Sequence, residues 1–103
     1  MPKRVRSHEE SLIQRLREPE YAANYLNAVL DDKGSDHKER FLLALRDVAK
    51  AYGMTKLAGE TEMAREAMYR ALSETGNPEF ETLTALLDAV GLRLAIETKK
   101  KAS

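Results

Sequence analysis

The sequence predicts an all-α domain of five or six helices that ends in one short β-strand. Apolar residues recur at helical spacing from about residue 12 to residue 90. Glycine and proline interrupt this pattern at intervals, as they do between helices. Residues 92–97 then alternate apolar and polar side chains, which is the pattern of a strand.

The first two predicted helices meet at a proline. Ser7 and Glu10 have the spacing of a capping box, and an apolar stripe that includes Leu12 and Leu16 follows. Pro19 ends this helix and suits the first turn of the next one. The second helix is expected to reach the polar turn at residues 31–34.

A third, longer helix has the most regular apolar spacing in the chain. Asp36 and Glu39 predict its N-terminus, and Gly53 predicts its end. Its inner face is expected to comprise Phe41, Leu42, Leu45, Val48, Ala49 and Tyr52.

The remaining predicted helices are shorter. Residues 55–61 and 64–73 indicate two short helices. In the turn that follows, Asn77 is expected to cap the last helix and Pro78 to open it, and Gly91 to end it.

The predicted strand has no second strand to pair with. An unpaired edge exposes backbone hydrogen-bonding groups, so we expect the strand to pair with the same strand of a second copy across a two-fold axis. Leu92, Leu94 and Ile96 are then the dimerisation residues. Two alternatives remain: the segment packs on the helices, or it pairs with residues near Val5.

Composition excludes several classes of protein. The 103 residues include 17 basic and 17 acidic side chains and no cysteine, so disulfide frameworks and thiolate metal sites are excluded. No secretory signal or membrane-spanning run is present, and a cytoplasmic location is expected.

Charge divides the chain into three parts. Residues 1–17, a basic tail with a short helix, carry a net charge of +3, and the lysines of the basic tail 99–103 add the same. The single domain predicted between them, residues 18–98, carries −6. Such segregation favours two partners of different charge.

The two short helices have the layout of a DNA-binding helix-turn-helix. Leu57 and Ala58 provide an apolar anchor and a small crossing residue, and residues 61–63 form the turn. Met68 and Leu72 are expected to fix the second helix from beneath. Its outward side chains are Arg65, Glu66, Tyr69 and Arg70. Arginine is the commonest reader of guanine in the major groove.

The same residues carry a family resemblance. Residues 57–92, with Gly76-Asn77-Pro78, Thr82-Leu83 and Val90-Gly91, resemble the Xre/Cro-type, lambda-repressor-like helix-turn-helix. From about residue 18 onward the chain also resembles the addiction module antidote family, which comprises HigA-related antitoxins. This second resemblance rests on residues 18–21, 25–28, 41–49 and 69–73.

The resemblance implies a function with two partners. Family members bind and neutralise a small basic toxin of the RelE/HigB superfamily, and as dimers they bind the operator DNA of their own operon. Carried onto this chain, it implies base-facing roles for Arg65, Glu66 and Arg70, with Ala64 and Tyr69 beside them, and phosphate contacts for Lys56 and Asn77.

Two residues depart from the family pattern. Glu62 replaces the glycine of the turn, and Ala64 replaces the Ser or Thr that commonly begins the recognition helix. The second change removes a helix N-cap that is worth roughly 1 kcal/mol.

Acidic and aromatic residues of the second helix are candidates for binding the toxin. Asp31 and Asp32 could steer a basic partner, and Tyr21 and Tyr25 could anchor it. The alternatives are an ordinary solvated loop and half-buried tyrosines that only pack.

Catalysis, a metal site and a cofactor are not expected. The two histidines lie apart without a ligand-like spacing, and no glycine-rich phosphate loop is present. Two other functions remain open: a stand-alone Xre-type regulator without a toxin, and a protein-interaction module that has lost DNA binding.

Overall fold

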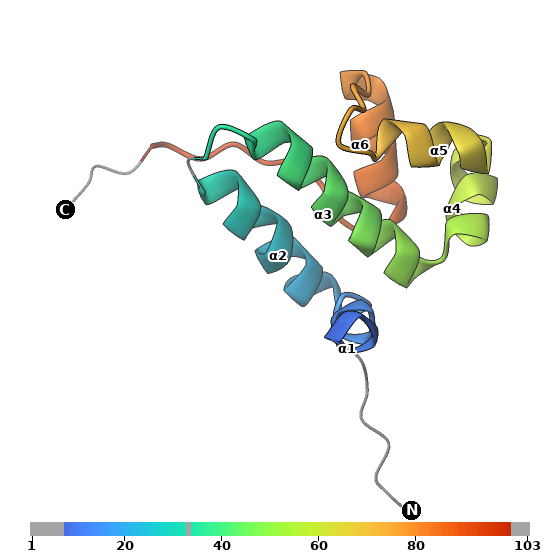
Figure 1. The fold of residues 1–103 in the computed structure, drawn as a ribbon, viewed down its shortest axis with the longest axis horizontal. Helices are drawn as coiled ribbons and strands as arrows, with labels where there is room; N and C mark the ends of the chain where they lie inside the picture. Colours follow the sequence, from blue (N-terminus) through green and yellow to red (C-terminus); the bar gives the residue numbers. More distant parts are fainter. Residues whose placement is uncertain (1–7, 33, 100–103) are drawn as a thin grey trace, which may run out of the picture.

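The computed structural model describes residues 8–32 and 34–99, and this part of the chain contains six α-helices and no β-strand (Figure 1). The all-α prediction is therefore confirmed with six helices. Their bounds are α1 His8–Arg15, α2 Pro19–Asp31, α3 His37–Tyr52, α4 Met54–Thr61, α5 Arg65–Ala71 and α6 Phe80–Ala89.

Helices α2 and α3 lie side by side and run in opposite directions, with α3 central (Figure 1). Ala22 and Leu26 of α2 are buried against the apolar face of α3, as their spacing predicts. Tyr25 of α2 also donates a hydrogen bond to the Asp47 carboxylate of α3 at 2.9 Å. Helix α1 packs on α3 as well.

A second group of buried residues joins α4, α5 and α6 to α3. The side chains of Leu57, Met68 and Leu72 have no exposed surface, and Leu86 is 1% exposed. Leu57 belongs to α4, Met68 to α5 and Leu86 to α6, and Leu72 directly follows α5. The packing of these four residues holds the two short helices at a fixed orientation.

Several predicted helix ends differ from the structure. Helix α4 begins at Met54, and α5 is shorter than the predicted range 64–73. Helix α6 begins at Phe80 after an N-cap at Glu79, so Asn77 and Pro78 precede it instead of starting it. The chain must first cross from the end of α5 to α6, and residues 72–79 form this non-helical connection.

The predicted helix caps have different outcomes in the structure. Asp36 is the N-cap of α3, but it makes no capping hydrogen bond because its carboxylate binds the Arg40 side chain at 2.9 Å. Gly53 ends α3 with a φ of 116°, as predicted. The capping box at Ser7 lies outside the described residues.

The predicted strand is wrong for the single chain, since residues 92–99 contain no strand. A strand requires a neighbour whose backbone completes its hydrogen bonds, and the described part of the chain offers none. Leu92 packs against the core, as the alternative reading expects. Leu94 and Ile96, however, are 44% and 99% exposed.

No helix in the described part of the chain is long and apolar enough to cross a membrane.

Replacing Gly76 by alanine is expected to destabilise the domain. Gly76 is buried beneath the end of α5, where a Cβ would overlap the Ala71 carbonyl oxygen and lie 2.8 Å from that of Arg70. The backbone must shift to relieve this overlap, at a cost of about 1–3 kcal/mol. Urea unfolding measures the change.

Gly59→Ala is the matched control. Gly59 lies within α4 with open space where a Cβ would go, so alanine should stabilise by roughly 0.5–1 kcal/mol. Equal effects of the two substitutions would contradict the close approach at Gly76.

Candidate nucleic-acid interface

Helices α4 and α5, here called the α4–α5 unit (residues 54–71), are joined by a tight turn. The backbone N–H groups of Glu62 and Met63 both donate to the Ala58 carbonyl, and the Thr61 hydroxyl donates to Leu57 O at 2.7 Å. Glu62 adopts a left-handed conformation with φ 59° and ψ 29°. This is the position where the sequence lacks the expected glycine, and a glycine would adopt it without strain.

Ala64 is the N-cap of helix α5, and its side chain makes no capping hydrogen bond. This agrees with the loss of the usual hydroxyl at that position. The helix has only seven residues, too few to be stable alone in water. Its orientation therefore depends on buried Met68 and Leu72.

The structure brings four of the predicted DNA-facing residues to the solvent side of α5. Ala64, Arg65, Glu66 and Arg70 are all exposed. Among the residues that the structure describes, the two arginines form no ion pair. Their donors are available to an external partner.

The side chains of Tyr69 and Lys56 are in contact with residues of α3. The Tyr69 ring is half-buried, and the Arg46 guanidinium of α3 lies 5.1 Å from its centroid. The Lys56 amine lies 4.6 Å from the centre of the Tyr52 ring. Both contacts are cation–π pairs that tie the α4–α5 unit to α3.

Sequence reasoning missed Arg46 and Tyr52 as supports of this surface. Tyr52 donates a hydrogen bond to Glu60 of α4, which raises the pKa of the Tyr52 hydroxyl. Among the described residues, the Nε atom of Arg46 is buried without a hydrogen-bond partner. An arginine beside the apolar stripe of α3 was the available signal, but only the folded chain shows its aromatic neighbour.

Asn77 lies in the connection between α5 and α6. Its side-chain oxygen accepts a hydrogen bond from Lys38 of α3 at 3.4 Å. Asn77 is exposed and lines a cleft that Arg70 also lines. Two of the predicted DNA-binding residues thus meet at the C-terminal end of α5.

The acidic candidates lie near the N-terminal end of α3, where Arg40 contacts two of the carboxylates of this loop. Arg40 binds Asp32 at 2.7 Å and Asp36 at 2.9 Å, and the hydrogen bond from Arg40 lowers the pKa of Asp32. Asp31 is exposed at the end of α2. One cation therefore offsets part of the negative charge predicted for this loop.

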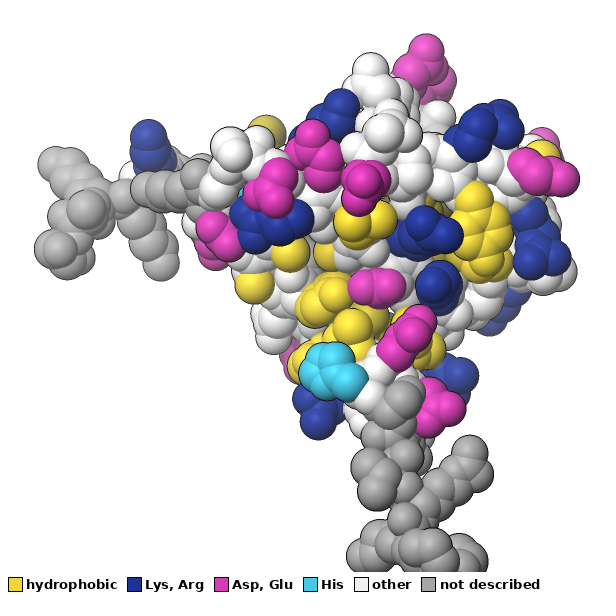
Figure 2. Space-filling view, viewed as in Figure 1, with side chains coloured by type: hydrophobic (Ala, Val, Ile, Leu, Met, Phe, Trp, Pro, Cys, Tyr) yellow, Lys and Arg dark blue, Asp and Glu magenta, His cyan; other side chains and the backbone are white. Residues whose placement is uncertain are grey.

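The two tyrosine candidates are half-buried on α2. Burial and the hydrogen bond to Asp47 raise the pKa of Tyr25 to about 12. The Tyr25 hydroxyl thus serves to hold α2 on α3. Figure 2 shows that hydrophobic side chains gather where α1 and α2 meet, with acidic and basic side chains around them.

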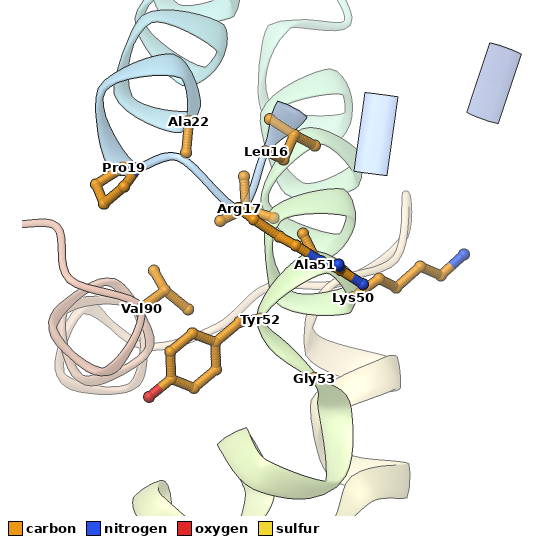
Figure 3. Close-up of a pocket in the computed structure, with 10 residues that line it drawn as sticks. Leu16, Arg17, Pro19, Ala22, Lys50, Ala51, Tyr52, Gly53 and Val90 are labelled. Carbon is orange, nitrogen blue, oxygen red and sulfur yellow. The ribbon is translucent and has the colours of Figure 1, made fainter. Parts of the chain in front are cut away.

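A groove of about 430 Å³ opens where the α1–α2 turn meets the end of α3 (Figure 3). Its walls include Leu16, Pro19 and Val90, and Arg17 extends along it toward Lys50. The groove joins three distant parts of the sequence, which is why no pattern in the sequence indicated it. Within residues 8–32 and 34–99, no cluster of His, Asp or Glu could hold a metal ion.

Glu62→Gly is expected to stabilise the domain. A left-handed conformation costs a residue with a side chain roughly 1–2 kcal/mol, and glycine recovers part of this after its extra freedom in the unfolded chain is counted. We expect a gain of about 0.5–1 kcal/mol, measured by thermal and urea unfolding.

Glu66→Gly removes the same charge in the same unit. Glu66 lies in the first turn of α5, where glycine should cost up to about 1 kcal/mol. A loss of stability in both variants would show that Glu62 is not strained.

Comparisons with known proteins identify the family of this chain. A family model described as "Probable addiction module antidote protein" matches residues 8–98. An uncharacterized protein of Haemophilus influenzae is 37% identical over 76 residues, which cover 74% of this chain and 75% of that protein. No solved structure matches the chain significantly. As its sequence resemblance indicated, the chain belongs to the family of probable addiction module antidote proteins.

Proposed function

We propose that this chain is the antitoxin of a type II toxin–antitoxin module that neutralises a small basic RelE/HigB-like toxin and, as a homodimer, represses its own operon. The observation that carries the DNA-binding part is the α4–α5 unit, in which a tight turn presents exposed Arg65 and Glu66 at the start of α5. In helix-turn-helix proteins the N-terminal residues of the second helix contact base edges in the major groove.

The charge of the α4–α5 unit sets a limit on DNA affinity. Its three cations, Lys56, Arg65 and Arg70, are matched by Glu60, Glu62 and Glu66. Affinity for duplex DNA comes largely from neutralised phosphates. One copy of the unit therefore binds weakly, and two copies together with cations outside the unit are needed.

Residues 92–97 are the proposed means of dimerisation. Leu94 is 44% exposed and Ile96 is 99% exposed, although both are large apolar residues. Pairing this segment with its copy across a two-fold axis would complete its backbone hydrogen bonds and cover both side chains. Such a dimer can present two α5 helices to successive major grooves, roughly 34 Å apart.

Helices α1 and α2 are the proposed surface for the toxin. Residues 8–32 contain six acidic and two basic side chains, a net charge of −4. The half-buried apolar residues Ile13, Tyr21 and Val29 lie on the same two helices. An apolar surface with acidic surroundings suits a basic protein partner, because the charges steer its approach.

The neutral α4–α5 unit also favours a second candidate function. A protein-interaction module that no longer binds DNA would retain this fold without the need for surplus positive charge. A measurement of DNA binding distinguishes the antitoxin that represses its operon from the protein-interaction module.

Arg65→Ala is expected to reduce preference for the promoter of the chain's own operon. A bidentate arginine–guanine contact supplies about 1–3 kcal/mol of discrimination. The ratio of promoter to scrambled-duplex affinity should therefore fall by about 5- to 150-fold. Fluorescence anisotropy measures the ratio, and sedimentation checks that the dimer persists.

Arg17→Ala is the control, since this exposed arginine lies before α2 and distant in sequence from α5. Its promoter preference should equal that of the wild type. Failure of the wild-type chain to prefer its promoter would favour the protein-interaction module.

Asp31→Lys is expected to slow association with the toxin encoded beside this chain. Charges at the rim of an interface act mainly on the association rate, so we expect a several-fold decrease at low salt that disappears at high salt. Stopped-flow binding measures the rate, and co-expression tests growth rescue.

Glu81→Lys reverses an exposed charge on α6, outside the proposed surface. An equal decrease for this variant would indicate a general charge effect and contradict the α1–α2 surface. Absence of any complex with the wild-type chain would refute the antitoxin function itself.

A further inference from the structure

We propose that residues 92–98 of two copies of this chain pair in a single antiparallel register, with Ala95 on the two-fold axis, in the groove beside α6. The proposal rests on the dimerisation part of the proposed function and deepens it, because it names the groove that seats the second copy. It also makes Arg93 and Glu97 the residues that select a second copy of this chain as the partner.

The groove lies between α6 and residues 92–94 and has a volume of about 570 Å³. Its apolar lining includes Phe80, Leu92 and Leu94. Phe80 is 72% exposed, although it is a large apolar residue. On the other side of the same segment, against α2, the open space is only about 80 Å³. A second strand therefore has room on the α6 side.

The backbone of the segment is free to pair. It runs from the end of α6 toward the loop between α2 and α3 (Figure 1). The Leu92 N–H donates to the Leu87 carbonyl at 2.8 Å, but within the described part of the chain the backbone of residues 93–98 makes no hydrogen bond. The segment contains no proline, so each residue can donate to a ladder. Such an unpaired edge is a template for another strand.

Two-fold symmetry restricts the possible registers of this pairing. Directly opposite residues of an antiparallel pair point to the same face of the sheet, and neighbouring residues point to opposite faces. A two-fold axis perpendicular to the sheet leaves each residue on its own face. At the centre of the pairing a residue must therefore lie opposite its own copy. The registers to compare are those centred on one of residues 93–97.

Charge disfavours most of these registers. A centre at Arg93 or at Glu97 places like charges directly opposite each other, which is destabilising. A centre at Ile96 places Arg93 opposite Lys99 of the second copy, again with like charges. A centre at Leu94 leaves both Arg93 and Glu97 opposite uncharged residues. None of these registers gives the charged residues a partner of opposite sign.

The register centred on Ala95 pairs all the side chains favourably. Arg93 lies opposite Glu97 of the second copy, and symmetry forms this pair twice. Leu94 lies opposite Ile96 of the second copy, whose side chain is 99% exposed in the single chain. Arg93 and Glu97 are both exposed and form no ion pair among the described residues. Their charges are thus available to the second copy.

Disulfide cross-linking tests the register, because the chain has no cysteine of its own. Directly opposite residues have Cα atoms about 4.5–5.5 Å apart, which is within reach of a disulfide. Ala95→Cys should therefore cross-link rapidly under mild oxidation. Leu94→Cys and Ile96→Cys place the two sulfur-bearing residues on a diagonal, about 7–8 Å apart, and should cross-link slowly.

Charge reversal tests the selection of the partner. Arg93→Glu alone, or Glu97→Arg alone, replaces two attractive pairs by two repulsive ones, so the dimer Kd should rise by about 10- to 100-fold in sedimentation. An equal mixture of the two variants should form a heterodimer of wild-type affinity, because the charges of one chain then complement those of the other. Glu20→Arg reverses an exposed charge on α2 and should leave the Kd unchanged.

Truncation of one exposed side chain on each side of the segment tests the seat of the second copy. Phe80→Ala, on the α6 side, should raise the dimer Kd several-fold. Leu30→Ala is the control, since Leu30 is 44% exposed and lines the narrow space on the α2 side. Circular dichroism checks that each variant is folded. Equal effects of the two substitutions would overturn the seat beside α6.

The outcomes separate the register from dimerisation itself. A wild-type dimer that cross-links fastest through Leu94→Cys or Ile96→Cys would overturn the register and leave the proposed function intact. Failure of the mixed charge variants to recover affinity would do the same. A wild-type chain that sediments as a monomer would overturn dimerisation, and this proposal with it.

Discussion

The burial of four apolar side chains from α4, α5 and α6 is the constraint on which the rest of this structure depends. Leu57, Met68, Leu72 and Leu86 lie together in the core with at most 1% of their surface exposed. Helix α5 is only seven residues long and lacks a side-chain cap, so it has little stability of its own. The direction in which Arg65 and Arg70 point is therefore set by this packing. Loss of this packing would therefore change the orientation of the proposed DNA-facing surface.

Helix α3 links the two proposed partner surfaces. On one side, Tyr25 of α2 bonds to Asp47 of α3, which fixes the helix proposed to meet the toxin. On the other side, Arg46 lies over Tyr69 of α5, and Lys38 contacts Asn77 beyond it. The residues that hold each surface thus share one rigid element. The side chains that hold one proposed surface are different from those that hold the other.

Features that depend on the local spacing of residues could be predicted from the sequence. Apolar periodicity predicted the long α3, and the departure from the family pattern was noted at Glu62, which the structure shows with a left-handed backbone. Long-range contacts were not predictable: no spacing rule places Arg46 over Tyr69 or Lys38 beside Asn77. The strand was predicted only from the alternation of apolar and polar residues, and this alternation describes the side chains alone. A strand also needs a partner backbone, which the described part of the single chain lacks.

The negative charge of Glu62 is the reason that the proposed DNA binding needs cations outside the α4–α5 unit. A glycine there would remove both the backbone strain and a negative charge beside the proposed DNA-binding surface. With glutamate in place, the α4–α5 unit has no net charge, so contacts within it cannot supply the electrostatic part of DNA affinity. Cations outside the unit must then contribute, and Lys38 is held beside the end of α5 by its bond to Asn77. In the proposed dimer each such contact is doubled, so the proposed DNA affinity would depend on association of the chains and would fall steeply with dilution and with salt.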